Sequence, residues 1–266
     1  MPLQGIVCPQ SGQFETFETC CRKHNDSEEK DCNAPRFLLN ELSKNDEKRK
    51  EVRISSTVMT GCARSYAIKQ SRPYFIELPS GWNMARGTWA HAMFQNGEYP
   101  EEEYLVEERL RKFFHYESYQ IPITGQPDEV NKVRGILIDY KTKHMVPTTV
   151  PIEHIAQFNI YVWLLKGGEI VTKDSPRLGE TVDIDIVRGG MHYVSWQPKV
   201  PWRRIQVPIW DSFDTEEWML ERMLPLLSWQ DSGILPSCNS LFTYGKCECQ
   251  KLEESHYDYW RTHGIT

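Results

Sequence analysis

The segment Ile136–Lys143 constrains the fold of this chain more than any other stretch. Three apolar residues lead into Asp139, and Lys141 follows two places later. Successive side chains of a strand point to opposite faces, so Asp139 and Lys141 should point the same way. The apolar run predicts a strand buried on both faces, with charge only at its end. Such a pair can hold a divalent cation and position a phosphate or a water. Taken alone, a surface ion pair on an edge strand is the alternative.

A second carboxylate, Asp128, lies upstream in a strand broken by turn residues, and residues 131–135 indicate a hairpin link. Asp128 and Asp139 on neighbouring antiparallel strands can lie side by side. Two carboxylates that close repel each other unless a cation lies between them. The spacing Asp-x10-Asp-x-Lys is therefore far more specific than Asp-x-Lys alone.

Helical patterns adjoin these strands in the sequence. Residues 151–165 carry an apolar stripe, with Gln157 and Tyr161 four places apart and hence on one face. An earlier helix carries His91, and a lone helical histidine is more often a packed or capping residue than a ligand. Asp214 and Glu217 predict a capping box at the start of a late helix.

Composition limits the function classes. No apolar run is long enough to cross a bilayer and the first residues form no signal peptide, so we expect a cytoplasmic protein with no membrane partner. In that compartment the 8 cysteines indicate metal or redox chemistry before disulfides. The net charge of −6 argues against a surface coated in positive charge, but it is compatible with a local basic groove.

The first 52 residues are polar and indicate a small module followed by a linker. A structural zinc ion takes Cys and His ligands and would order a segment too polar to build its own core. Adjacent cysteines rarely bind one ion together, so one of Cys20 and Cys21 should be spare. The alternative is a flexible tail bearing thiols. The candidate zinc ligands are Cys8, Cys20, Cys21, His24 and Cys32.

Three more cysteines lie late in the chain, where neither a helix nor a strand period explains them. With one cysteine from an early helix they make four, which is the ligand count of an iron–sulfur cluster or of a zinc site with four cysteines. The third alternative is that these four cysteines are unrelated thiols that bind no metal together. The four are Cys62, Cys238, Cys247 and Cys249.

Taken together, these residues resemble a known family. The order is a cysteine, a histidine, an aspartate, Asp-x-Lys, Gln-x3-Tyr and three late cysteines. It is similar to the RecB-like branch of the PD-(D/E)XK nucleases, and within it to the CRISPR-associated exonucleases of the Cas-four family. The likeness covers about residues 53–250. It implies an α/β, restriction-endonuclease-like core in residues 53–266, with a mixed central sheet flanked by helices and an iron–sulfur cluster that joins its two ends.

The resemblance also implies roles for single residues. Lys141 would position the attacking water and stabilise the phosphate, and Gln157 and Tyr161 would contact DNA or complete the active site. The ligands of Mn²⁺ or Mg²⁺ would be His91, Asp128, Asp139 and the main-chain carbonyl of Tyr140. The ligands of a [4Fe–4S] cluster would be Cys62, Cys238, Cys247 and Cys249. We expect DNA-backbone contacts from Arg64, Lys199, Arg203 and Arg204.

The implied activity is that of a metal-dependent DNA exonuclease on single strands or overhangs. Its setting would be antiviral defence, where it would trim pre-spacers for a CRISPR integrase partner. Two features depart from the family pattern: the spacing Cys-x8-Cys-x-Cys of the late cysteines, and the amino-terminal Cys/His segment. The alternative function is non-enzymatic, with the chain binding DNA ends or docking a partner through the zinc segment.

Overall fold

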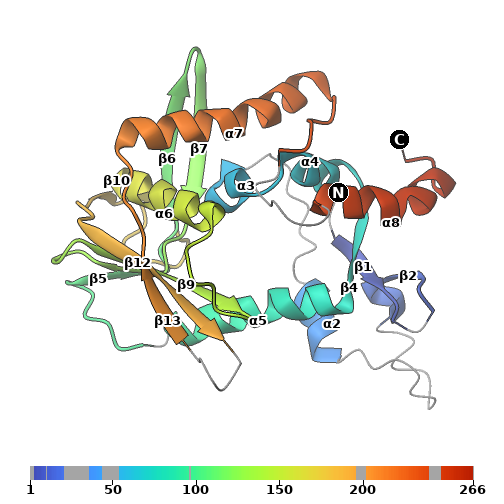
Figure 1. Ribbon diagram of the computed structural model, residues 1–266, viewed down its shortest axis with the longest axis horizontal. Helices are drawn as coiled ribbons and strands as arrows, with labels where there is room; N and C mark the ends of the chain where they lie inside the picture. Colours follow the sequence, from blue (N-terminus) through green and yellow to red (C-terminus); the bar gives the residue numbers. More distant parts are fainter. Residues whose placement is uncertain are drawn as a thin grey trace. The chain divides into compact units, whose positions relative to one another are not determined.

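The computed structural model describes residues 3–9, 11–20, 36–43, 54–95, 97–195, 202–239 and 247–265. Its elements divide between two compact units, drawn in Figure 1. Unit 1 comprises Met1–Val52, Arg64–Trp89 and Tyr244–Thr266, and unit 2 comprises Arg53–Ala63 and Ala90–Thr243. The chain therefore passes between the units four times, after residues 52, 63, 89 and 243.

A small sheet and an apolar cluster organise unit 1. Strand β1 (Leu3–Val7) pairs antiparallel with β2 (Phe14–Thr16) and parallel with β4 (Tyr74–Glu77). The cluster joins β1 to helix α2 (Arg36–Ser43), because Leu38 and Leu39 pack with Leu3 and Ile6. The remaining helices with residues in this unit are α4 (Ala63–Ser71), α5 (Leu78–Gln95) and α8 (Glu248–Thr262).

Unit 2 contains two five-stranded mixed sheets, whereas the sequence predicted one central sheet. The first has the order β11-β10-β6-β7-β3, and the second has the order β13-β12-β9-β8-β5. The strands of the first are β3 (Ile54–Ser55), β6 (Leu110–Tyr116), β7 (Tyr119–Gly125), β10 (Lys166–Ile170) and β11 (Thr181–Asp183). Those of the second are β5 (Tyr104–Val106), β8 (Glu129–Asn131), β9 (Ile136–Lys143), β12 (Arg188–Ser195) and β13 (Trp202–Gln206).

Strand β9 is the strand predicted from the apolar run, and its bounds are confirmed. It lies in the middle of its sheet, antiparallel to β8 and parallel to β12. The edge-strand alternative is therefore wrong. Leu137 and Asp139, which share one face of the strand, are fully buried, whereas Ile136, Ile138 and Tyr140 on the other face are half-buried, so only one of the two faces is covered as predicted.

Helix α6 (Ile152–Leu164) packs against both sheets of unit 2 and beside α7 (Ser212–Ser232) (Figure 1). Two glycines allow the close approach. A Cβ on Gly189 of β12 would lie 2.1 Å from the Phe158 ring, and one on Gly125 of β7 would lie 2.9 Å from the Tyr161 ring. Helix α6, which carries Gln157 and Tyr161, thereby packs closely against a strand of each sheet.

Helix α7 starts about one turn before the predicted position. Asp211 caps α7, because its side chain accepts a hydrogen bond from the Asp214 N–H, so the capping box predicted at Asp214 is wrong. Ser55 caps the short helix α3 (Ser56–Thr60), and Cys62 lies between α3 and α4. Within the described part of the chain, no helix combines the length and the apolar character that crossing a bilayer requires.

Candidate metal centre

Asp128 and Asp139 lie opposite each other, as the hairpin pattern predicted. Glu129 of β8 pairs with Ile138 of β9, so the next position of the same register sets Asp128 against Asp139. The Tyr140 N–H donates to Asp128 Oδ2 at 2.6 Å, which fixes the Asp128 carboxylate. Both carboxylates are buried, with 3% and 0% of each residue exposed.

Lys141 lies on the same face as Asp139, with its Nζ 2.8 Å from Asp139 Oδ2. Apart from that ammonium, neither Asp139 oxygen has a hydrogen-bond partner among the described residues. Burial raises the pKa of Asp139 to about 6. Burial lowers the pKa of Lys141, but the Asp139 and Asp128 carboxylates more than offset this, so the net shift is upward and the ammonium stays charged.

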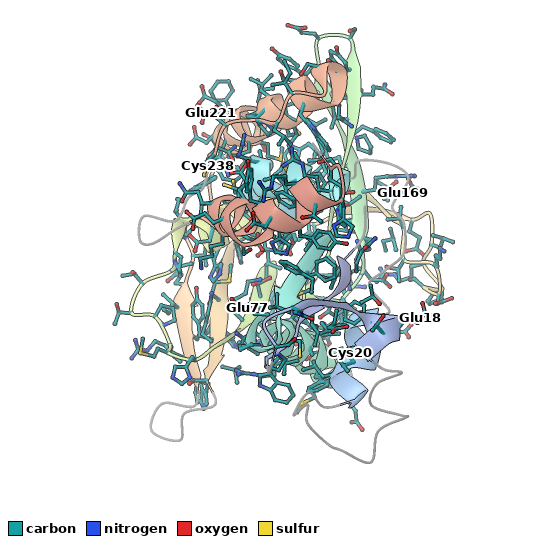
Figure 2. All side chains as sticks on the ribbon, turned by 90° about the vertical axis from the view of Figure 1, so that its right-hand side faces the viewer. Glu18, Cys20, Glu77, Glu169, Glu221 and Cys238 are labelled. Atoms are coloured by element: carbon teal, nitrogen blue, oxygen red, sulfur yellow. The ribbon has the colours of Figure 1, made fainter. Side chains whose placement is uncertain are left out.

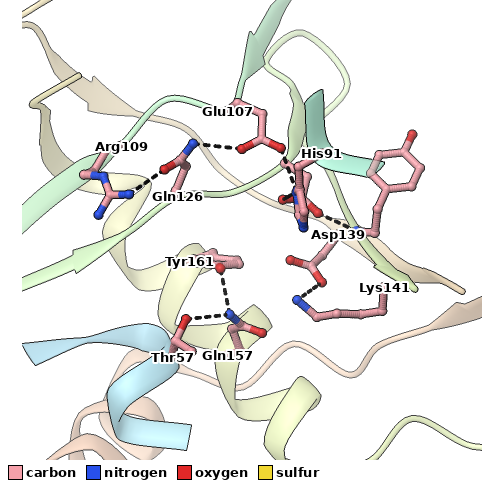
Figure 3. Close-up of polar contacts among 11 residues, drawn as sticks. Thr57, His91, Glu107, Arg109, Gln126, Asp139, Lys141, Gln157 and Tyr161 are labelled. Atoms are coloured by element: carbon pink, nitrogen blue, oxygen red, sulfur yellow. Dashed lines mark hydrogen bonds and ion pairs between the residues drawn. The ribbon is translucent and has the colours of Figure 1, made fainter. Parts of the chain in front are cut away.

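His91 of α5 reaches the same place (Figure 3). Its Nδ1 lies 2.8 Å from Glu107 Oε1 and 3.2 Å from Asp128 Oδ1. Hydrogen bonds to Asp128 and then to Glu107 raise the pKa of His91 to about 10, against the opposing effect of burial. The proton on His91 Nδ1 therefore lies between the Glu107 and Asp128 carboxylates. The same two negative charges would stabilise a metal cation at this place.

Glu107 was not predicted as a site residue from the sequence. This residue follows β5, is 8% exposed, and has a φ of 52°, in the left-handed region that disfavours side chains. The ligand atoms of His91, Glu107 and Asp128 all lie within 4.8 Å of one another and can hold a metal ion. No sequence signal separates Glu107 from Glu108 or from the three glutamates at 101–103.

Gln157 and Tyr161 lie on one face of α6, as their spacing predicted. The Gln157 Nε2 donates to the Tyr161 hydroxyl at 2.9 Å and to Thr57 Oγ1 at 3.4 Å. Burial raises the pKa of Tyr161 well above its usual value, and the Asp139 and Asp128 charges add to the effect. Figure 3 shows both side chains beside the Asp139–Lys141 pair.

Tyr140 contributes in another way as well as through its N–H. Its hydroxyl donates to Glu129 Oε2 at 2.7 Å, which holds the ring on the face of β9 opposite to Asp139. The use of its main-chain carbonyl as a metal ligand stays a prediction.

The four basic residues expected to contact DNA have different surroundings. The register across β9, β12 and β13 aligns Lys141, Tyr193 and Arg203 on one face, so Arg204 belongs to the opposite face. The Arg203 guanidinium donates to the Pro147 carbonyl at 3.2 Å. Arg64, on α4, forms an ion pair with Glu253 at 2.5 Å. Lys199 lies outside the described residues.

The four cysteines predicted to share a metal do come together. The Sγ atoms of Cys62, Cys238, Cys247 and Cys249 lie within 4.8 Å of one another, and the cluster can hold a metal ion. The Cys62 and Cys238 sulfurs are 3.7 Å apart. The buried guanidinium of Arg222 fixes the neighbouring backbone, since it donates to the carbonyls of Gly61 and Asn239.

The amino-terminal zinc prediction falls largely outside the described residues, which exclude Cys21, His24 and Cys32. Cys8 lies in a turn after β1, where its N–H donates to the Gln13 carbonyl at 2.8 Å. Cys20 is buried in the apolar cluster of unit 1 (Figure 2).

Comparisons with known proteins bear on the fold alone. No family model and no curated protein matches the chain. Among solved structures, the chain is similar to one described as the crystal structure of SSO0001, with a TM-score of 0.50 and 18% identity over 74% of this chain and 86% of that chain. The fold is an α/β arrangement of mixed sheets flanked by helices, and the described residues include a histidine–carboxylate group and a four-cysteine cluster.

Proposed function

We propose that this protein is a divalent-metal-dependent nuclease with a PD-(D/E)XK-type core. The observation that carries the proposal is the buried Asp139 carboxylate, which has no partner but the Lys141 ammonium among the described residues and lies beside Asp128 and His91. The Lys141 ammonium lies against only one of the two Asp139 oxygens, and a bound cation would satisfy the other, whose burial without a partner costs free energy.

The donor set fits a transition-metal or magnesium ion. Six ligands at about 2.1 Å from an ion lie about 3.0 Å apart along the edges of an octahedron. The His91 Nδ1 lies 2.8 Å from Glu107 Oε1 and 3.2 Å from Asp128 Oδ1, which matches those edges. One imidazole among carboxylates favours Mn²⁺ over Mg²⁺, because Mg²⁺ prefers oxygen ligands only.

The chain's own groups have separate tasks in phosphodiester hydrolysis. A bound divalent ion would polarise the scissile phosphate and lower the pKa of a water molecule. The Lys141 ammonium, which Asp139 holds in place, puts a positive charge where negative charge develops on the phosphate oxygens. The Tyr161 hydroxyl, oriented by Gln157, offers a hydrogen bond on the same side.

The finer proposal follows the family resemblance. The substrate is single-stranded DNA or an overhang, the action is exonucleolytic, and the cellular task is the trimming of pre-spacers for a CRISPR integrase. The metal at the four cysteines is a [4Fe–4S] cluster with a structural role, and the alternative occupant is Zn²⁺. Arg203 supports a DNA path on this side of the sheet, since it shares a face with Lys141.

The test is degradation of end-labelled single-stranded DNA with Mn²⁺ by the wild type, by Asp139→Asn and by Asp183→Asn. Asp183 is an exposed aspartate on β11, so its variant controls for the loss of one carboxylate. We expect cleavage by the wild type and the control and none by Asp139→Asn. Equal cleavage by all three would refute the proposal. Tight DNA binding without cleavage under any divalent ion would favour the non-enzymatic alternative.

A further inference from the structure

We propose that Gln126, held by Arg109, is a positioning residue that presents Glu107 to the metal as a fourth side-chain ligand, beside His91, Asp128 and Asp139. This inference rests on the proposed metal site. It adds three residues that neither the Asp-x-Lys pattern nor the family resemblance assigns. Figure 3 shows the chain of contacts that runs from Arg109 through Gln126 to Glu107 and His91.

The backbone of Glu107 adopts an unfavourable conformation. A non-glycine residue with a φ of 52° costs free energy and persists only where its surroundings impose it. Here the Glu107 N–H donates to the Asp128 carbonyl at 3.0 Å, so the strained residue is tied to the backbone of a candidate ligand. The Glu107 side chain is buried, and its carboxylate faces His91.

The Gln126 amide bridges Glu107 and Arg109. Its Nε2 donates to Glu107 Oε2 at 2.8 Å, and its Oε1 accepts from the Arg109 guanidinium at 2.8 Å. A guanidinium can only donate and a carboxylate can only accept, so the two partners dictate which end of the amide faces which. The amide therefore links the two groups in one orientation only.

The hydrogen bond from Gln126 leaves one oxygen of the Glu107 carboxylate available to a metal ion. With Oε2 engaged by Gln126, the other oxygen, Oε1, faces His91 Nδ1 at 2.8 Å. Without the amide, the carboxylate could rotate about its last bond and lose that alignment. Partners of this kind orient metal-binding groups, and their removal typically weakens metal binding about 10- to 100-fold.

An independent observation indicates that the site takes a cation. Asp139, fully buried next to this group, keeps an oxygen without a hydrogen-bond partner among the described residues. Figure 3 shows this carboxylate between the His91 group and Lys141.

The test is direct Mn²⁺ binding, measured by titration calorimetry and by the paramagnetic resonance signal of free Mn²⁺, without DNA. The variants are Gln126→Asn, whose side chain is too short to reach both partners, and Gln126→Leu, which has no polar group. Gln120→Leu is the control, because Gln120 is an exposed glutamine near the start of β7, whereas Gln126 follows the end of that strand.

We expect a dissociation constant at least tenfold higher for both Gln126 variants, with an unchanged unfolding midpoint in EDTA, and wild-type binding by the control. The double variant Glu107→Gln/Gln126→Asn should bind no more weakly than Glu107→Gln alone, because Gln126 acts through Glu107.

Two outcomes would overturn the inference, and only the second would also refute the nuclease proposal. If the wild type binds Mn²⁺ and cleaves DNA while Gln126→Asn binds equally well, Gln126 positions nothing and the nuclease proposal survives. If the wild type binds no Mn²⁺, both the inference and the nuclease proposal fail.

Discussion

The Lys141 ammonium lies 2.8 Å from a carboxylate oxygen of Asp139, a residue with no exposed surface. Among the described residues, Asp139 has no alternative hydrogen-bond partner. In this pair, the Asp139 carboxylate can bind a cation and the Lys141 ammonium can bind an incoming phosphate. Metal binding and phosphate stabilisation are thus assigned to two different side chains, and substitutions should separate them.

Replacing Lys141 by Gln should impair cleavage without impairing metal binding. The ammonium faces the carboxylate and is no ligand, so we expect DNA cleavage to fall at least about a hundredfold, as for other lost charge-stabilising groups. Mn²⁺ affinity should stay equal or rise, since the ion then has no competing positive charge beside Asp139. Lys166→Gln, at an exposed lysine paired with Asp183, is the control. Weaker Mn²⁺ binding with intact cleavage would contradict this division of roles.

Metal binding should depend on pH through His91. The pKa of His91 is raised to about 10, so the imidazole is protonated at neutral pH and must lose that proton to bind an ion. Between about pH 6.5 and about pH 8.5, the logarithm of the Mn²⁺ association constant should therefore rise by about one per pH unit. Below about pH 6 the slope should steepen, because Asp139, with its pKa raised to about 6, becomes protonated as well.

Calorimetric titrations at several pH values check the pH dependence. The variant His91→Asn should bind more weakly, and its affinity should be nearly independent of pH above about 6.5. A wild-type affinity that stays constant across the neutral range would show that His91 releases no proton on metal binding.

The strands and helices near the site could be predicted because their signals are local. The apolar run before Asp139 located β9, and the stripe in residues 151–165 located α6. The pairing of β10 with β6, which builds a second sheet, joins residues 58 positions apart at Glu169 and Arg111 and has no local signature. Glu107 was missed because its role depends on a strained φ and on Gln126, and only the folded chain supplies either of them.

The four cysteines should retain metal when the protein is purified without oxygen. A brown protein with visible absorption and iron bound would support the [4Fe–4S] assignment, and a colourless protein with one zinc would support a four-thiolate ion. Cys249→Ser should lower whichever metal is bound, because Cys249 is fully buried within the group. Elemental analysis of iron, zinc and manganese separates this cluster from the His91 site. Metal content unaffected by Cys249→Ser would exclude the cluster as the binding site.

At position 107 the glycine variant should be more stable than the alanine variant, whereas at position 108 it should not. An L-residue in the left-handed region is disfavoured, whereas glycine is not, so Glu107→Gly should be more stable than Glu107→Ala by about 1 kcal/mol. Urea unfolding in EDTA measures this difference without any contribution from metal. Glu108 provides the matched pair: its φ is not positive, so Glu108→Ala should be at least as stable as Glu108→Gly. Both Glu107 variants should also lose Mn²⁺ affinity. If the glycine and alanine variants had the same order of stability at positions 107 and 108, the turn would relax when the Glu107 carboxylate is removed. Glu107 and Gln126 would then hold the strained conformation together.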